Sequence, residues 1–309
     1  MSHSTHTYQN DDRNQSILIN INGELFPRHE AKVSVFDSAF MLGDGVWEGL
    51  RVHNGKVAFL KTHLDRLYAG AKALDFHPGI TQTELLERID STLAANQMKE
   101  GVHLRLMVSR GTKSTPYQDP RVTISKPTIV IIPEYKETLA ETITKGIDLF
   151  TVHVRRGFPD VQDPKLNSHS KINCIVACIQ ATKAGASEAL MLDPHGFVAT
   201  CNSTHFFIVK DSKVITSTGQ FCIDGVTRGA VLKICKREGF EWAETNFSLS
   251  DVYSADEAFV TGTFAGLVPV ISVDGRQIGE ADIDSNDRRG PMVKKLQSLY
   301  MKLVDEDCQ

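Results

Sequence analysis

The chain has 309 residues, 41% of them hydrophobic, so it is long enough to bury the cores of two domains. A formal net charge of −4 without a basic cluster argues against a nucleic-acid partner, and no apolar run approaches the length of a membrane helix. Six scattered cysteines are expected to be free thiols in a reducing compartment, so we expect a cytoplasmic protein.

The first part of the chain alternates hairpin and helix signals. Asn22-Gly23 and Asn54-Gly55 each adjoin strand-like hydrophobic residues, and these pairs favour type I′ turns between antiparallel strands. Leucines at helical spacing predict amphipathic helices that lie on a sheet. The expected helices cover residues 60–74 and 85–93, and the expected strands cover 103–108 and 127–132.

A polar, charged stretch over residues 134–142 predicts a connection between two domains, 1–133 and 143–309. The second domain mixes strands and helices without strict alternation, so the fold class is α+β. Asp274-Gly275 predicts a third hairpin. The expected strands cover 147–154, 189–192, 204–210 and 258–261, and the expected helices cover 172–179, 228–237 and 291–303.

Two conspicuous patterns do not predict a site. The segment 43–49 is rich in glycine, but its spacing misses the dinucleotide-binding fingerprint and it leads into a strand rather than a helix. Cys174 and Cys178 are four apart on a predicted helix, but no second Cys or His pair lies close enough in the sequence to complete a metal site. No metal is therefore expected.

Two turns place small hydroxyl residues where an anion can bind. Val226 and Thr227 directly precede a predicted helix, so their backbone N–H groups and the Thr227 hydroxyl could meet an anion at the helix N-terminus. The segment 261–266 closes another strand with threonines and glycines. We interpret these turns as a phosphate cradle, although ordinary helix capping explains either turn alone. Arg66 is by default a surface residue, but turned towards a phosphate it would add positive charge.

Together these segments resemble the fold-type IV (class IV) aminotransferases, which depend on pyridoxal 5′-phosphate. The resemblance runs from about Val33 to the C-terminus and implies a homodimer with a small N-terminal α/β domain. It also implies a larger C-terminal domain, in which a β-barrel-like mixed sheet and helices bind the cofactor. The motifs that carry it are Val35-Phe36-Asp37-Ser38, Gly43–Arg51, His63–Leu67, Glu188–Asp193, Gly225–Arg228 and Gly262-Thr263.

The resemblance assigns roles to single residues. Arg66, Val226, Thr227 and Thr263 are implied to hold the cofactor phosphate. The family also needs a lysine that forms a Schiff base, just before the helix that begins near residue 172. Lys165 and Lys171 compete for this role, and we favour Lys165 because its spacing to Asn173 and Glu188 is that of branched-chain-like members.

One departure from the family pattern concerns the pyridine nitrogen of the cofactor. Where the family usually has a glutamate, this sequence has Thr200, and a hydroxyl offers only a neutral hydrogen bond, so the electron sink is expected to be weaker. The resemblance further implies that Trp47 forms a pocket wall. Arg105 and Arg110 match positions where different members bind the substrate carboxylate.

The expected function is transfer of an amino group between a branched-chain or similar aliphatic amino acid and a 2-keto acid. A D-amino-acid or (R)-amine transaminase and a lyase of the aminodeoxychorismate type share the fold and stay open. So does a catalytically weak relative that binds the cofactor, because Thr200 replaces the usual glutamate. The expected partners are a small-molecule amino donor and a keto-acid acceptor.

Overall fold

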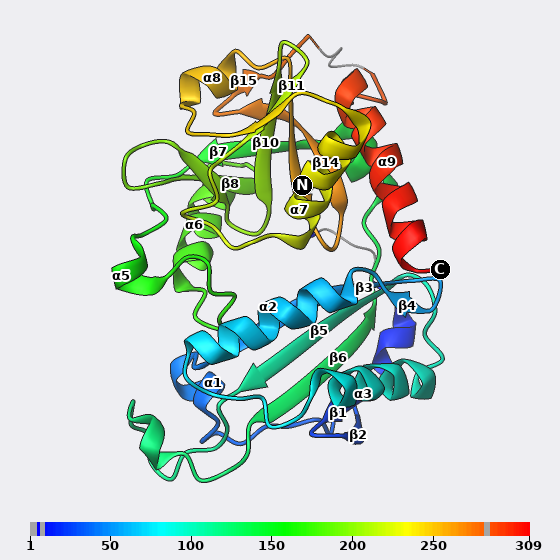
Figure 1. Ribbon diagram of the computed structural model, residues 1–309, viewed down its shortest axis with the longest axis vertical. Coiled ribbons are helices and arrows are strands. Elements are labelled where there is room, and N and C mark those ends of the chain that lie inside the picture. The colour runs from blue at the N-terminus through cyan, green and yellow to red at the C-terminus, as the bar shows by residue number, and fades with distance from the viewer. Residues whose placement is uncertain (1–4, 7–9, 281–284) are drawn as a thin grey trace. The chain divides into compact units, whose positions relative to one another are not determined.

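The computed structural model describes residues 5–6, 10–280 and 285–309 (Figure 1). These residues divide into two compact units. The N-terminal unit holds residues 10–137, Leu166–Lys171 and Asp307–Gln309, and the C-terminal unit holds residues 5–6, 138–165, 172–280 and 285–306. The chain changes unit within the expected connection, between Glu137 and Thr138. Leu166–Lys171, which we call the strap, belongs to the N-terminal unit although both of its flanks belong to the other.

The N-terminal unit is a sheet covered on one face by two helices. Its described strands form a six-stranded sheet in the order β2-β1-β6-β5-β3-β4, with every neighbouring pair antiparallel. Figure 1 shows α2 and α3 over the same face of this sheet. The elements are β1 (Leu18–Ile21), β2 (Glu24–Pro27), α1 (Ser38–Leu42), β3 (Gly45–His53), β4 (Lys56–Val57), α2 (Leu60–Ala73), α3 (Gln82–Ala95), β5 (Val102–Ser109) and β6 (Thr128–Tyr135).

Side-chain alternation explains why this sheet has one covered face. Along β5 the even positions from Val102 to Val108 are buried, whereas His103, Arg105 and Met107 are half-buried on the opposite face. The buried face packs against leucines and isoleucines of α2 and α3 to form the core of the unit. The other face of the sheet carries the side chain of Arg105.

The C-terminal unit is built on a mixed sheet. Nine strands of its described residues form the sheet in the order β12-β11-β10-β13-β14-β7-β8-β9, with β15 paired to β14. The pairs β14–β7, β7–β8 and β11–β12 are parallel. The elements are α4 (Ala140–Lys145), β7 (Ile147–Thr151), α5 (Pro159–Gln162), α6 (Ile172–Lys183), β8 (Glu188–Leu192), β9 (Val198–Cys201), β10 (His205–Lys210), β11 (Lys213–Thr216), α7 (Val226–Glu238), β12 (Trp242–Glu244), α8 (Leu249–Tyr253), β13 (Glu257–Gly262), β14 (Gly266–Val273), β15 (Arg276–Gln277) and α9 (Pro291–Asp307).

All three predicted hairpin turns are confirmed. Asn22-Gly23 joins β1 to β2, Asn54-Gly55 joins β3 to β4, and Asp274-Gly275 joins β14 to β15. Both residues of each pair have positive φ, as a type I′ turn requires. Strand β7 ends at Thr151, although we expected it to reach residue 154. Beyond Thr151, the backbone N–H groups of Val152 and Arg156 bond to carbonyl oxygens of β8, but the regular strand pairing does not continue.

Helix α6 corrects one expectation. Its hydrophobic spacing predicts that Ile172, Ile175, Val176 and Ile179 pack on a sheet, but their side chains are between 39% and 69% exposed. Ala177 and Ala181 are buried instead, in a cluster with Val152, Ala189 and Met191. Alanines let the helix approach β8 closely, so the branched side chains face outward.

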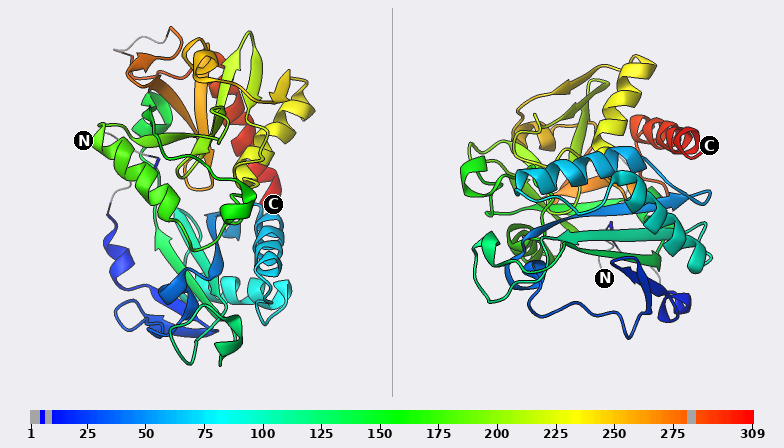
Figure 2. Two further views of the ribbon diagram at one scale, coloured as in Figure 1. Left: turned by 90° about the vertical axis from the view of Figure 1, so that its left-hand side faces the viewer. Right: turned by 60° about the horizontal axis from the view of Figure 1, so that its bottom comes forward.

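The remaining helices of the C-terminal unit lie on its sheet. Helix α7 packs on β13, and both figures show α9 beside α7 (Figures 1 and 2). Arg237 near the end of α7 pairs with Glu306 of α9 at 2.9 Å.

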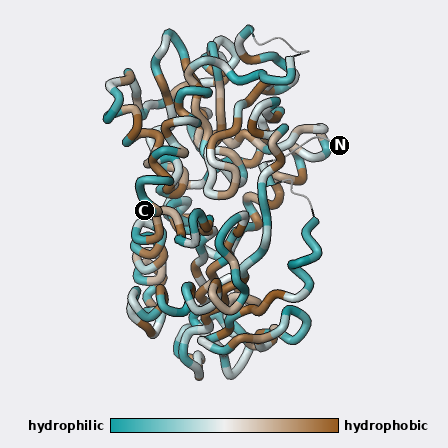
Figure 3. Tube along the Cα trace, turned by 90° about the vertical axis from the view of Figure 1, so that its right-hand side faces the viewer, coloured by the Kyte–Doolittle hydropathy of each residue, from teal (hydrophilic) through white to brown (hydrophobic). Residues whose placement is uncertain are grey.

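The trace in Figure 3 alternates between hydrophobic and hydrophilic stretches. No helix among residues 5–6, 10–280 and 285–309 is long and apolar enough to cross a membrane.

Candidate active site

The start of α7 offers backbone N–H groups to a ligand. The helix begins at Val226 after Gly225, and no side chain caps it. The first N–H groups of a helix have no partner within the helix, and here the bond from Gly229 N to Gly225 O is the first that closes. Thr227, in this first turn, is buried. The uncapped turn therefore suits an anion.

A close contact between His205 of β10 and Gly225 places the end of this strand beside the turn. A Cβ atom on Gly225 would clash with the His205 ring, so only glycine lets the ring approach. His205 Nε2 is 2.8 Å from the Ile223 carbonyl oxygen, and His205 pairs with Thr261 across the sheet. The strand end that carries Thr261 is thereby next to the start of α7.

Thr261 carries an orphaned hydroxyl. Its Oγ1 is buried and has no hydrogen-bond partner within the described residues, although burying a hydroxyl without one is costly. Thr263 follows in the turn between β13 and β14, and it is half-buried. An unsatisfied hydroxyl beside an uncapped helix is the donor set that a phosphate group needs, so these residues fit the expected cofactor.

Thr200 points its hydroxyl into the protein. On β9, Thr200 Oγ1 donates to the Thr204 carbonyl oxygen at 2.8 Å, and the residue is buried. The nearby Thr204 hydroxyl donates to Glu188 Oε2 at 2.8 Å, and Thr5 hydrogen-bonds the other oxygen of Glu188. Burial raises the pKa of Glu188 to about 7, against hydroxyl bonds that lower it. Thr204 thus links Thr200 to Glu188, because its carbonyl oxygen accepts from Thr200 and its hydroxyl donates to Glu188.

The two candidate lysines lie in different units. Lys165 ends a C-terminal segment: its side chain is exposed, its backbone N donates to Asp163 Oδ1 at 2.9 Å, and Pro164 before it is buried. Lys171 ends the strap, and its Nζ lies 5.4 Å from the centre of the Trp47 ring. Lys165 directly precedes the strap, whose Ser168 forms a β-bridge with Val46.

Arg66 has a buried partner in the N-terminal unit. Its Nε and Nη2 donate to the two carboxylate oxygens of Glu48, at 2.8 and 2.6 Å. His63 Nδ1 lies 2.7 Å from the same carboxylate, and both His63 and Glu48 are fully buried. Burial disfavours charge on Glu48, but hydrogen bonds from His63 and Arg66 outweigh it and lower the pKa of the carboxyl. Glu48 therefore fixes the guanidinium of Arg66.

The two arginines expected to bind a carboxylate differ in environment. Arg110 binds Asp44 at 2.7 and 3.1 Å and the Leu74 and Asp75 carbonyl oxygens at 2.6 and 3.0 Å. Arg105 instead lies flat on the Trp47 ring, 3.7 Å from its centre, and burial lowers its pKa. Within the described part of the chain no hydrogen bond engages the guanidinium of Arg105, whereas Arg110 uses its N–H groups for Asp44 and two carbonyl oxygens.

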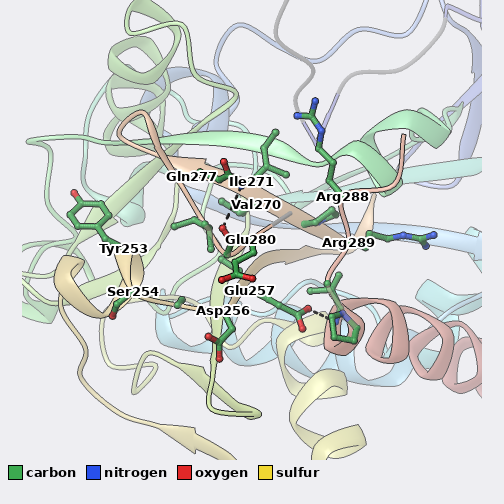
Figure 4. Close-up of a pocket in the computed structure, with 18 of the residues that line it drawn as sticks. Tyr253, Ser254, Asp256, Glu257, Val270, Ile271, Gln277, Glu280, Arg288 and Arg289 are labelled. Carbon is green, nitrogen blue, oxygen red and sulfur yellow. Dashed lines mark hydrogen bonds between the residues drawn. The ribbon is translucent and has the colours of Figure 1, made fainter. Parts of the chain in front are cut away.

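A separate cavity in the C-terminal unit contains none of the predicted site residues. Its volume is about 690 Å³. It is lined by the start of β13, the middle of β14, the residues that follow β15 and the segment before α9 (Figure 4). Glu257 in its wall already accepts the N–H groups of Met292 and Val293, at 2.9 and 2.8 Å. This carboxylate therefore caps α9 and is not free for a ligand.

The predicted site residues are divided between the two units. Thr200, Val226, Thr227, Thr263 and Lys165 belong to the C-terminal unit, and Trp47, Arg66, Arg105 and Arg110 belong to the N-terminal unit. Reasoning from the sequence missed Glu48, although it is a charged residue at an inward position of β3, between Val46 and Leu50. It used Glu188 only as part of a family motif and did not predict that this carboxylate is buried.

Comparison with known proteins gives a consistent likeness. A family model described as amino-transferase class IV matches residues 45–273. Branched-chain-amino-acid aminotransferase-like protein 2 of Arabidopsis thaliana is 40% identical over 292 residues, which are 94% of this chain and 51% of that protein. The putative branched-chain-amino-acid aminotransferase of Methanocaldococcus jannaschii is 40% identical over 285 residues, covering 91% of this chain and 94% of that protein.

Solved structures agree with these relatives. The crystal structure of a branched-chain amino acid aminotransferase complexed with N-(5′-phosphopyridoxyl)-L-glutamate matches with a TM-score of 0.84 and 29% identity, covering 94% of this chain and 95% of that one. The α+β fold of type IV expected from the sequence is confirmed. This chain spans about half the length, 51%, of the Arabidopsis relative.

Proposed function

This chain belongs to the class IV amino-transferase family, and we propose on that premise that it is an aminotransferase dependent on pyridoxal 5′-phosphate. The amino group moves between a branched-chain or similar aliphatic amino acid and a 2-keto acid. One observation carries the proposal: the uncapped start of α7 lies beside the orphaned Thr261 hydroxyl, where the fold family holds a phosphate. A solved relative described as a complex with a phosphopyridoxyl compound supports the same cofactor.

The cofactor phosphate is assigned to four residues. Val226 and Thr227 contribute backbone N–H groups and a hydroxyl at the start of α7, and Thr263 contributes its hydroxyl. Arg66 contributes a guanidinium that Glu48 holds in a fixed orientation. Its assignment rests on the family motif and on that fixed geometry. When bound, the cofactor supplies the electron sink for bond breaking at the amine-bearing carbon.

Lys165 is assigned two roles. It binds the cofactor covalently in the resting enzyme, and its amine, once released, moves the proton at the amine-bearing carbon as general base and acid. The exposed position of Lys165 leaves its amine open to small molecules. Lys171 is the competing assignment.

Substrate contacts are assigned to the uncovered face of the N-terminal sheet. Trp47 forms an aromatic wall. Arg105 binds the carboxylate because its N–H groups bond to none of the residues that the structure describes, whereas those of Arg110 do. The donor and acceptor are small molecules.

Thr200 supports a second candidate function. Its hydroxyl, bonded to the Thr204 carbonyl oxygen, brings no charge to the pyridine nitrogen, so the electron sink is weak. A D-amino-acid or (R)-amine transaminase, a lyase of the aminodeoxychorismate type and a cofactor-binding protein with little turnover are the alternatives of the same fold.

Two measurements test the proposal. Borohydride reduction of the protein with pyridoxal 5′-phosphate, followed by peptide mapping, is expected to place the reduced adduct on Lys165, and an adduct on Lys171 or none refutes that assignment. Keto-acid-dependent amine transfer is then measured with L-amino acids, D-amino acids and amines. Transfer from L-leucine or L-valine supports the primary function, and pyruvate release from aminodeoxychorismate supports the lyase.

The oligomeric state and location complete the proposal. We assign a homodimer because α6 leaves Ile172, Ile175 and Ile179 exposed in a row, and a second copy of the chain would cover them. Ile175→Glu is expected to shift the mass measured by light scattering from two chains to one, and an unchanged mass rejects α6 as the interface. None of the six cysteines forms a disulfide within the described residues, which supports a location in the cytoplasm.

A further inference from the structure

We propose that Arg156 is a positioning residue that sets the span between Lys165 and the start of α7. The inference rests on the proposed function, because it concerns the lysine and the phosphate-binding turn assigned there. Arg156 lies outside all the motifs that carry the family resemblance. It follows β7 and is half-buried in the C-terminal unit, to which all the residues concerned belong.

One guanidinium binds three separate segments. Its Nη2 donates to the Pro164 carbonyl oxygen at 3.1 Å, its Nε donates to the Phe221 carbonyl oxygen at 3.1 Å, and its Nη1 lies 3.3 Å from Cys174 Sγ. The backbone N of Arg156 is itself anchored to the Leu192 carbonyl oxygen at 2.9 Å, at the end of β8. The side chain therefore links three segments to the sheet.

The bound segments are those that matter for the site. Pro164 precedes Lys165 directly, so a bond to the Pro164 carbonyl fixes the peptide that leads into Lys165. Phe221 lies in the loop that leads to Val226. Arg156 thus links the segment that carries the Lys165 amine to the loop that leads into α7.

Aromatic packing stiffens the same place. The rings of Phe158, His195 and Phe221 meet edge to face, with centroids between 5.6 and 6.1 Å apart. Phe221, whose carbonyl oxygen Arg156 holds, is one of them. The loop before α7 is thereby held both through its ring and through its backbone.

The chemistry of arginine suits this task. No carboxylate lies within ion-pair distance of Arg156 in the part of the chain that the structure describes, so its partners are two carbonyls and a thiol rather than a counter-charge. A planar guanidinium directs several donors in fixed directions, whereas a lysine ammonium is a compact charge on a flexible stem. Geometry, rather than charge pairing, is what this residue provides.

A fixed span has a measurable consequence. A ligand that has both an aldehyde and a phosphate binds more favourably when the distance between the Lys165 amine and the phosphate-binding turn matches the distance between these two groups. The second contact then forms within one complex. A ligand with the aldehyde alone has no such gain. Loss of Arg156 is therefore expected to reduce the advantage of pyridoxal 5′-phosphate over pyridoxal.

The experiment compares two probes on the full chain after removal of bound cofactor. Pyridoxal 5′-phosphate and pyridoxal are each added, the adduct is reduced with borohydride, and the rate of modification at Lys165 is read by peptide mapping. In the wild type the phosphate compound is expected to react faster. In Arg156→Gln the ratio of the two rates is expected to fall roughly tenfold. Arg155→Gln, which changes the neighbouring exposed arginine, is the matched control and is expected to keep the wild-type ratio.

The outcomes separate the inference from the proposed function. An equal fall of both rates in Arg156→Gln, or an unchanged ratio, overturns the positioning role alone. Modification of the wild type at another residue overturns the assignment of Lys165, and the inference with it. If Arg156→Gln does not fold, Arg156→Lys decides: it keeps the charge but not the three directed bonds, so a lowered ratio supports the inference and a wild-type ratio rejects it.

Discussion

Arg66 meets Glu48 edge-on inside the N-terminal unit, with Nε and Nη2 at 2.8 and 2.6 Å from the two oxygens of one fully buried carboxylate. Such a pair fixes the plane of the guanidinium as well as its place. The orientation of the remaining N–H groups of Arg66 is therefore set by Glu48, a residue of β3. The first prediction follows from this contact.

Glu48→Gln is expected to lower the free energy of unfolding by about 3 kcal/mol, because it leaves a mostly buried guanidinium without its counter-charge. Since the pKa of Glu48 is lowered in the folded protein, this contribution is fully present above pH 4.5 and is lost as the pH falls through the lowered pKa. Urea unfolding of both proteins between pH 3 and 7 measures the difference. Asp65→Asn removes the exposed pair with Lys61 and is expected to change stability little; an equal loss in both variants contradicts the prediction.

Glu188 predicts the opposite dependence on pH. Its pKa rises from 4.5 to about 7 on folding, so the folded state binds the proton more tightly and stability falls as the pH rises from 4.5 to about 7. The fall is roughly 3 kcal/mol at 1.4 kcal/mol per pKa unit. Glu188→Gln keeps the shape and is expected to lose this dependence. Unfolding free energies at pH 5 and 8 test it, and identical slopes for both proteins would falsify it.

Substitution of Arg105 is expected to affect substrate binding, whereas substitution of Arg110 is expected to affect stability. Arg105→Met removes a guanidinium that rests on Trp47, and it is expected to raise the KM for the amino acid about tenfold with little loss of stability. Arg110→Met breaks bonds to Asp44 and two carbonyls, so it is expected to lower the melting temperature. Steady-state kinetics and thermal melts on both variants distinguish the roles. An unchanged KM in Arg105→Met removes that residue from the site.

Thr200→Glu is expected to speed amine transfer, on the hypothesis that a carboxylate keeps the pyridine nitrogen protonated. The gain in kcat is expected to be about tenfold or more, within the range typical of a positioned charge. Thr200→Val, which removes the hydroxyl without adding charge, is the control and is expected to show no gain. A slower Thr200→Glu enzyme with a normal melting temperature contradicts the idea that Thr200 limits the electron sink.

Local signals predicted local structure well. Asn-Gly and Asp-Gly pairs predicted all three hairpins because few residues tolerate positive φ. Gly225-Val226-Thr227 before a helical pattern predicted where a helix N-terminus lies, whereas the absence of a side-chain cap there became known only from the structure. The hairpins and the helix start depend on neighbours in the sequence, so the sequence shows them directly.

Features that depend on distant partners were not predictable. Arg156 looks like any loop arginine, and only the fold brings Pro164, Cys174 and Phe221 to it. Helix α6 has the spacing of a helix packed by isoleucines, yet it packs through alanines, because spacing shows that a helix has an apolar side but not what covers it.

The strap also bears on how relatives of this chain can be recombined. Six residues from the middle of the sequence, Leu166–Lys171, belong to a unit otherwise made of residues 10–137 and Asp307–Gln309, with Ser168 bridged to Val46. A hybrid gene cut once, between Glu137 and Thr138, therefore joins a foreign strap to the native β3, including the tight approach of His169 to Gly45. We therefore expect viable hybrids to carry the strap and residues 10–137 from the same parent.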